Sequence, residues 1–391
     1  MNIGSVLREQ RLKMGLTVTE AARLGGVTRS YLSMVETGKR APNPEALVGF
    51  TRRVNVPTDA WLPAFLADER RCPRLVSLGR ALYQAGDYSA ARSSLSRAFF
   101  VSRFGDGGRY NTEIYELLGK VYYAQGRYLR ALRWFRLVDR AVRHTADERL
   151  QAMTSYNMAQ CMAKVGQEIE ALPKFDEAIQ TFRSLQLWDE LGRTWLAKAN
   201  LLLTRRMYQE CHLAYRHAAH FLRGKPFHAD ALLGVAITAG ALHGAKAAEP
   251  LLRTLAEDQD VDVVVRTKAR SNLATVLREL GRYEEAISQT QMGLSARIGL
   301  SSGLAAAMLA EATLCHVQLH NERAAVRALE EYKAIVGNKD SQDIATMRIL
   351  ARVLGTKPPK DHLPRSLADD YEGRLSAALR VLADPRDMTW D

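Results

Sequence analysis

The chain has 391 residues, of which 47% are hydrophobic and 25% are charged, a composition that excludes a disordered or fibrous protein. Its net charge of +12 is uneven: residues 1–224 carry 34 basic and 21 acidic side chains, whereas residues 225–391 carry 21 and 22. A basic half favours a polyanionic partner, with a solvated surface as the alternative.

Residues 1–56 are predicted to form a small helical domain, with helices over residues 3–14, 18–24, 29–37 and 44–54 and a tight turn at residues 25–27. Thr17 and Glu20 have the spacing of a capping box, and Thr28 is placed to cap the third helix. Two short helices joined by a small-residue turn are typical of a helix-turn-helix. The apolar positions expected to face inward are Val6, Leu7, Leu12, Ala21, Ala22, Leu24, Leu32 and Val35.

The run from Thr28 to Pro42, TRSYLSMVETGKRAP, closely resembles the Cro/phage-repressor (XRE) family of DNA-binding domains. The resemblance implies that the helix from Arg29 to Glu36 lies in the DNA major groove, where a guanidinium pairs bidentately with guanine. Contacts to phosphates would position the domain without reading sequence. The implied DNA-binding residues are Thr28, Arg29, Ser30 and Ser33 near the helix start, and Lys39, Arg40 and Asn43 after it.

Other positions of this domain qualify the resemblance. Arg11 and Glu36 match the structural ion pair of the family. Val18 departs from it, because the family often has a glutamine there that contacts the DNA backbone. Two roles stay open for Tyr31, a core residue or a groove contact. The alternative for the whole domain is a helix-turn-helix that makes only protein contacts.

Residues 57–74 are predicted to be a linker helix closed by Pro73. An internal repeat follows over residues 75–336. Its turn residues Gly86, Gly126, Gly166 and Arg206 are 40 residues apart, and Gly281 begins the same motif again. In each predicted pair of helices, the glycine ends the first helix in a left-handed conformation, and a small residue in the second allows close packing.

These units resemble tetratricopeptide repeats, most closely over residues 280–287, although the usual period is about 34 residues. Weaker units are predicted near 229–256 and 304–336. Because each unit buries its apolar face against its neighbour, the array is expected to form a right-handed superhelix. Residues 337–391 are predicted to cap it with helices at 341–354 and 365–383. The predicted fold is therefore all-α throughout.

Asparagines recur at one position of the repeats, nine residues before the glycine, where the tetratricopeptide family often holds a peptide. An amide side chain offers both a donor and an acceptor to a peptide backbone, and nearby cations suit a carboxylate. The alternative is that these asparagines only cap or solvate their helices. Asn157 and Asn272 hold this position, whereas Asn200, six residues before Arg206, lies three residues further along its helix. The predicted peptide-binding residues are Asn157, Asn200, Asn272, Lys164, Arg193 and Lys268.

The order of the two parts resembles that of the cytoplasmic peptide-pheromone receptors of Gram-positive bacteria, the group of PlcR, PrgX, Rgg and NprR. The resemblance implies a homodimeric, quorum-sensing transcription regulator that binds a double-stranded DNA operator and a short peptide effector. The alternative is a DNA-tethered adaptor whose repeats recruit a protein partner without a small effector.

Six arginines lie three or four residues apart in one predicted helix, at positions 127, 130, 133, 136, 140 and 143. Three interpretations stay open for them: a solvated face, an auxiliary contact to DNA or another anionic partner, and pairing between subunits.

The sequence contains no HExxH, Walker loop or GxSxG motif, so we expect no enzyme, no catalytic residue and no cofactor. The histidines at 212, 217 and 220, and the Cys315, His316 and His320 group, lack carboxylates at metal-ligand spacing. No apolar run reaches the length of a membrane helix, and no signal peptide follows Met1. Four scattered cysteines suit a reducing compartment. We therefore expect a cytoplasmic protein without metal or membrane.

Overall fold

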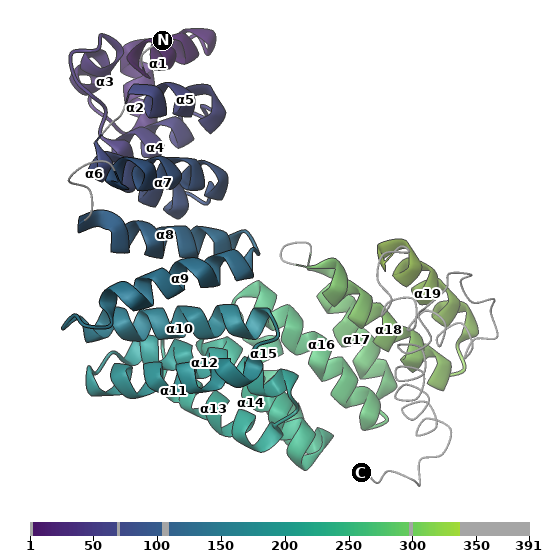
Figure 1. Cartoon of the computed structure of the whole chain (residues 1–391). Helices are drawn as coiled ribbons and strands as arrows, with labels where there is room; N and C mark the ends of the chain where they lie inside the picture. The colour runs from purple at the N-terminus through teal and green to yellow at the C-terminus, as the bar shows by residue number, and fades with distance from the viewer. Residues whose placement is uncertain (1–2, 69–70, 104–108, 297–299, 337–391) are drawn as a thin grey trace, which may run out of the picture. The chain divides into compact units, whose positions relative to one another are not determined.

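The computed structural model describes residues 3–68, 71–103, 109–296 and 300–336, and within them it contains nineteen helices and no strand. The predicted all-α fold is confirmed. The chain divides into two compact units, residues 1–187 and residues 188 onward, and Figure 1 labels the helices of both. The predicted capping helices at 341–354 and 365–383 fall outside the described residues.

Five helices form the N-terminal head of the first unit: α1 (Ile3–Lys13), α2 (Val18–Gly25), α3 (Arg29–Glu36), α4 (Pro44–Arg53) and α5 (Thr58–Asp68). The predicted capping box is present, because the Thr17 hydroxyl accepts from the Glu20 amide and the Glu20 carboxylate accepts from the Thr17 amide. Gly26 then ends α2 in the left-handed conformation, with φ of 68°. The sequence therefore specifies both ends of this short helix locally.

The prediction that Leu12 and Leu24 face the core of the head is wrong. Leu12 is 58% exposed and Leu24 is 46% exposed. On α1 the inward position next to Leu12 is taken by Arg11, whose charge is neutralised by Glu36. On α2 the small residues Ala21, Ala22 and Gly25 fill the buried face. A charged residue with a buried partner thus displaced an apolar one from the predicted stripe.

The predicted linker helix exists as α5, but it is part of the packed head. Trp61 and Phe65 of α5 are 1% and 2% exposed, and α5 contacts α1 on one side and α7 on the other. Pro73 does not close this helix, because it stands in the first turn of α6 (Cys72–Gln84), where the missing N–H costs nothing.

Three helical hairpins complete the first unit. Helix α6 pairs with α7 (Tyr88–Arg103), α8 (Asn111–Ala124) pairs with α9 (Tyr128–Val142), and α10 (Glu148–Lys164) pairs with α11 (Glu168–Ser184). One cluster of buried side chains runs without interruption from Val6 in α1 to Val121 in α8. The head and the first hairpins therefore share a single core.

The second unit consists of four hairpins among its described residues. Helix α12 (Trp188–Thr204) pairs with α13 (Tyr208–Phe221), and α14 (His228–His243) pairs with α15 (Ala245–Glu257). Helix α16 (Val263–Glu279) pairs with α17 (Tyr283–Ser295), and α18 (Ser302–Gln318) pairs with α19 (Glu322–Val336). The two weaker predicted units correspond to the second and fourth of these hairpins.

The turns inside the hairpins have the predicted backbone geometry. Gly86, Gly126, Gly166 and Gly281 have φ between 72° and 80°, and Arg206 adopts 57° at the equivalent place. A left-handed conformation costs a residue with a Cβ atom about 1–2 kcal/mol. The repeat therefore imposes this turn even where its glycine has been replaced.

Candidate functional site

Helix α3, the predicted DNA-reading helix, is anchored by its inner face. Leu32 and Val35 are each 2% exposed in the head core. The Thr28 hydroxyl accepts a hydrogen bond of 3.2 Å from the Tyr31 amide and so caps the helix. Burial of two apolar side chains, together with a satisfied N-terminus, fixes where the outer face of α3 points.

A buried ion pair joins α1 to the end of α3. The Arg11 guanidinium donates from Nε and Nη2 to the two carboxylate oxygens of Glu36, at 2.7 and 2.9 Å, and from Nη1 to the Leu16 carbonyl oxygen at 2.7 Å. The hydrogen bond to Glu36 raises the pKa of Arg11 above its ordinary value. This is the family's structural pair predicted from the sequence, and it leaves Glu36, the only acid of α3, neutralised.

The exposed start of α3 carries the first four predicted contact residues. Thr28, Arg29, Ser30 and Ser33 are all exposed, so the structure places them on one accessible surface. Because the Thr28 oxygen accepts from the backbone, its hydroxyl hydrogen stays free to donate. The group combines one guanidinium with short hydroxyls at a helix N-terminus, which suits phosphate oxygens and base edges alike.

The residues after α3 are held against it. Gly38 turns the chain with φ of 72°, and the Arg40 amide donates to the Met34 carbonyl oxygen at 3.1 Å. Lys39, Arg40 and Asn43 are exposed. The Asn43 carboxamide oxygen caps α4 by accepting from the Ala46 amide, which leaves its NH₂ group free for an outside acceptor.

Tyr31 belongs to the scaffold of this surface. It is half-buried, its hydroxyl oxygen accepts from the Asn43 amide at 2.9 Å, and the Arg40 guanidinium carbon lies 5.1 Å from the centre of its ring. The sequence left open whether Tyr31 is a core residue or a groove contact, and these contacts support the structural role. Val18 is also half-buried and packs against the head core, so it offers no substitute for the polar contact of the family.

The predicted peptide-binding residues lie in both units. In the first unit, Asn157 of α10 is half-buried and Lys164, at the end of the same helix, is exposed. The amide nitrogen of Asn157 is buried and has no hydrogen-bond partner among the described residues. An unsatisfied buried donor is costly, which makes Asn157 the most distinctive of the six candidates.

In the second unit the predicted residues already make internal contacts. The Asn200 carboxamide oxygen accepts from the Tyr215 hydroxyl at 2.6 Å, and the Asn272 NH₂ group donates to the Lys268 carbonyl oxygen at 2.8 Å. Arg193 reaches the Asp189 carbonyl oxygen at 3.4 Å. Each asparagine keeps one half of its amide free, so peptide contact by both stays a prediction.

Two hollows were not found by sequence reasoning. One of about 390 Å³ lies between α6 and α8, where Arg80 pairs with Glu113 and Lys120 pairs with Glu116. Burial raises the pKa of Tyr83 at its edge. The signal in the sequence was the spacing of Glu113, Glu116 and Lys120, which places three charges on one face of α8.

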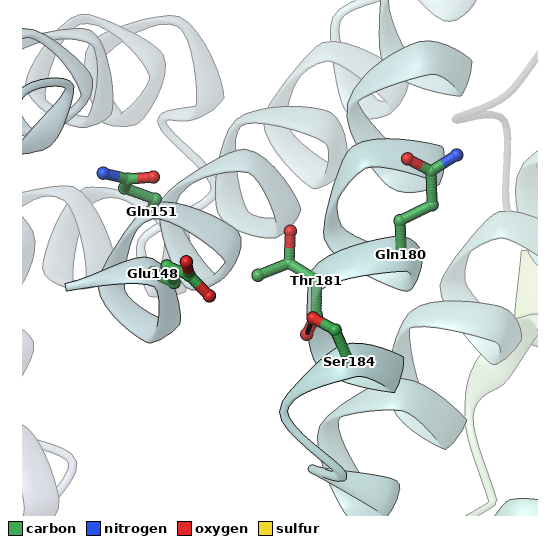
Figure 2. Close-up of a pocket in the computed structure, with 5 residues that line it drawn as sticks. All are labelled: Glu148, Gln151, Gln180, Thr181 and Ser184. Atoms are coloured by element: carbon green, nitrogen blue, oxygen red, sulfur yellow. Dashed lines mark hydrogen bonds between the residues drawn. The ribbon is translucent and has the colours of Figure 1, made fainter. Parts of the chain in front are cut away.

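The second hollow, of about 420 Å³, lies between the start of α10 and the end of α11. Figure 2 shows its lining, which is polar throughout: Glu148, Gln151, Gln180, Thr181 and Ser184. Gln151 is already engaged, because its NH₂ group donates to the carbonyl oxygens of Val142 and Thr145, both at 2.9 Å. These two hydrogen bonds hold the loop between α9 and α10.

The histidines have structural neighbours. His212 Nδ1 lies 2.9 Å from the Thr238 hydroxyl, and the His217 ring stacks on Trp195 at 4.8 Å. No group of three potential metal ligands occurs among the described residues. Within the same part of the chain, no helix combines the length and apolarity needed to cross a bilayer.

Comparisons with known proteins identify families for separate parts of the chain. Residues 7–61 match the helix-turn-helix family, and residues 76–144 and 267–289 match tetratricopeptide repeats. The chain therefore carries an XRE-type helix-turn-helix domain followed by tetratricopeptide repeats. No curated protein matches it.

Solved structures resemble the chain in fold. The apo form of the quorum sensor NprR from B. thuringiensis is 14% identical, with a TM-score of 0.56 over 95% of this chain and 99% of its own. A tetratricopeptide repeat protein from Parabacteroides merdae is 15% identical, with a TM-score of 0.52 over 73% of this chain and 99% of its own.

Proposed function

We propose that the protein is a homodimeric transcription regulator that binds an operator through α3 and binds an effector, a short linear peptide, through its repeats. The observation that carries the proposal is the exposed start of α3. It presents hydroxyls and a guanidinium on a helix whose position is fixed by buried side chains and by the Arg11–Glu36 pair. Preorganised groups of this kind suit base readout in the major groove.

In this proposal Arg29 reads a base, while Thr28, Ser30 and Ser33 contact base edges and phosphates beside it. Lys39, Arg40 and Asn43 hold phosphates and set the register of the head. Two protomers place their α3 helices in successive turns of the major groove, so their half-sites lie about 34 Å apart or a multiple of that distance. The operator is then a palindrome or a near-palindrome.

The repeats supply the response to an effector. In the first unit, Asn157 would hold a peptide backbone through its amide and Lys164 a carboxylate. In the second unit, Asn200 and Asn272 would hold a peptide backbone through the free part of each amide, and Arg193 and Lys268 would hold carboxylates. The ligand changes DNA binding only if it binds one arrangement of the dimer more tightly than the other. The fold shared with the quorum sensor NprR supports this arrangement of parts.

The first experiment is a selection of duplexes from a random DNA pool by the purified full-length protein. The proposal expects enrichment of a palindromic sequence, with half-sites about 10 base pairs apart, and a complex whose mass corresponds to two protomers per site. Recovery of unrelated sequences, with no enrichment over several rounds, would overturn it.

A second experiment tests the effector. A synthetic library of short linear peptides is screened for members that change the affinity for the selected operator. The double variant Asn157→Ala, Asn272→Ala should keep operator binding but lose the response to those peptides. If no peptide changes the affinity while operator binding is intact, the repeats act instead as a platform for a protein partner, and the adaptor function replaces the effector.

A further inference from the structure

The outer face of α9 is a row of cations. The helix buries Ala131, Leu132, Phe135, Val138 and Val142. Its opposite face carries Arg130, Arg133, Arg136 and Arg140, and Arg127 and Arg143 stand at its two ends. All six arginines are exposed. Leu129 is the one large apolar side chain exposed on this helix, at 62%.

Almost none of this charge is neutralised. Arg143 pairs with Asp139 at 2.7 Å, and Asp139 is the only acidic residue of α9. Arg127, Arg130, Arg133, Arg136 and Arg140 have no carboxylate partner among the described residues. Like charges three and four residues apart repel one another along a helix, so nothing within the described fold rewards this arrangement.

The second helices of other hairpins behave differently. On α11, Lys174 pairs with Glu177 at 2.7 Å. On α15 and α17, Arg253 and Arg282 share Glu249 and Glu285 in a network of ion pairs. These three helices therefore balance their surface charges, and the excess on α9 is not a consequence of the repeat.

The basic surface continues onto α7. Phe99 of α7 meets Trp134 of α9 edge to face, with ring centres 5.5 Å apart, so the two helices are neighbours. Helix α7 contains no acidic residue. The Ser93 hydroxyl already donates to the Ser89 carbonyl oxygen. The other exposed serines and the half-exposed arginines of α7 supply further donors: Ser89, Arg92, Ser96 and Arg97.

We infer that this α7–α9 surface binds the phosphodiester backbone of duplex DNA without reading its sequence. Guanidinium groups pair with phosphate oxygens bidentately and hydroxyls donate to them singly. From Arg130 to Arg143 the row is about 20 Å long, enough to follow several phosphates of one strand. The inference rests on the proposed function, because the same compact unit carries α3. The duplex is the flank of the operator that α3 holds, because one compact unit carries both helices.

The test uses the full-length chain with Arg130, Arg133, Arg136 and Arg140 all replaced by glutamine. The matched control removes the same charge from exposed positions of the second unit: Arg216, Arg223, Arg323 and Arg327, each replaced by glutamine. Both are titrated over a salt series with a minimal operator duplex, the same operator with long flanks, and an unrelated second duplex carrying another fluorophore.

Loss of four phosphate contacts should reduce the magnitude of the slope of log K against log salt by about 3.6. The reduction should appear with the long duplex and not with the minimal one. A wild type that brings the two fluorophores together, with no difference between the long and the minimal operator, would overturn the assignment to the flank. The control should match the wild type in both assays. The thermal midpoint of the α9 variant should not fall, because repulsion along the helix is relieved.

Unchanged slopes and unchanged co-localisation in the α9 variant would overturn the inference. Loss of the dimer in that variant, with DNA slopes intact, would also overturn it and assign the surface to an acidic protein face. Failure of the proposed function would look different. If the wild type prefers no DNA sequence, but the α9 variant still has a smaller salt slope than the wild type, the operator is rejected while this surface remains a DNA contact.

Discussion

At the scale of single residues, a few side-chain hydrogen bonds decide the conformation of the head. The cap at Thr28, the capping box at Thr17 and the Arg11–Glu36 pair are all present. The sequence did not predict that Arg11 would displace Leu12 from the buried face of α1, since a periodic pattern weighs apolar residues without their polar competitors. The role of Tyr31 could be assigned only from the structure, because its partners Arg40 and Asn43 lie nine and twelve residues away in the sequence.

Arg29→Ala should weaken binding to the selected operator by about 1–3 kcal/mol and relax the preference at a single base position. The physical reason is that only a guanidinium that reaches base edges distinguishes guanine from the other bases. Competition binding with all single-base variants of the operator measures the effect. Arg327→Ala, which removes an equally exposed charge from α19, serves as the control. An equal loss on every sequence would make Arg29 a phosphate contact.

We expect His212 to contribute to an acid sensitivity of the second unit, together with His228 and His316, whose pKa values burial also lowers. Burial lowers the pKa of His212 from the ordinary 6.5, and the nearby Arg216 and His243 lower it further. Because the Thr238 hydroxyl donates to the Gly234 carbonyl oxygen at 2.8 Å, Nδ1 of a neutral His212 donates to Thr238. A histidine with a depressed folded pKa binds its proton more readily when unfolded, so stability is constant above about pH 6.5 and falls below it.

The thermal midpoint of the wild type measured between pH 8 and pH 5 should therefore decline below about pH 6.5. His212→Gln should decline less over the same range, while a variant at the exposed His144 should follow the wild type. Parallel curves for all three proteins would show that another group controls the acid response.

At the scale of helices, the repeat was predictable because its turns and its small residues are dictated by geometry. The left-handed turn recurs at Gly86, Gly126, Gly166 and Gly281, and close packing needs small residues at fixed positions. What the sequence could not indicate is which neighbouring helices share a core. Pro73 and the short segment before it suggested a linker, whereas the burial of Trp61 in α5 joins the head to the first hairpins.

Gly119→Ala tests the close approach of α8 and α9. A Cβ atom at Gly119 would lie 2.7 Å from the nearest ring atom of Phe135, so we expect the first unit to lose about 1–3 kcal/mol through overpacking. Gly49→Ala is the matched control, since nothing lies within 4 Å of its Cβ position, and it should gain about 0.4–1 kcal/mol. Chemical unfolding measures both. Equal effects of the two variants would contradict the packing described for α8 and α9.

At the scale of the whole molecule, the sequence predicted a DNA-binding head followed by repeats, and both parts are present. It did not predict that the chain divides after residue 187, because the repeat continues across that point with the same period. The head and the first hairpins share the core from Val6 to Val121. We therefore expect an effector signal to move each head together with its first hairpins, without a flexible joint between them.

Trp61→Ala should destabilise the head and the first hairpins together. Trp61 is 1% exposed, and removing a buried tryptophan costs about 3–5 kcal/mol. Hydrogen exchange should show faster exchange from α1 through α8 in one cooperative step, with α16 and α17 unchanged. Leu129→Ala, at a side chain that is 62% exposed, should leave both regions as in the wild type. Faster exchange confined to α1–α5 would mean that the head folds independently.

We propose above all that this protein recognises a specific DNA sequence through α3. The most direct test is the affinity of the full-length wild type for its selected operator, compared with a shuffled duplex of equal length, across a salt series. We predict a preference of about 10³ or more for the operator at physiological salt, and an affinity that falls steeply with salt on both duplexes. Equal affinities for the two duplexes at every salt concentration would contradict the account.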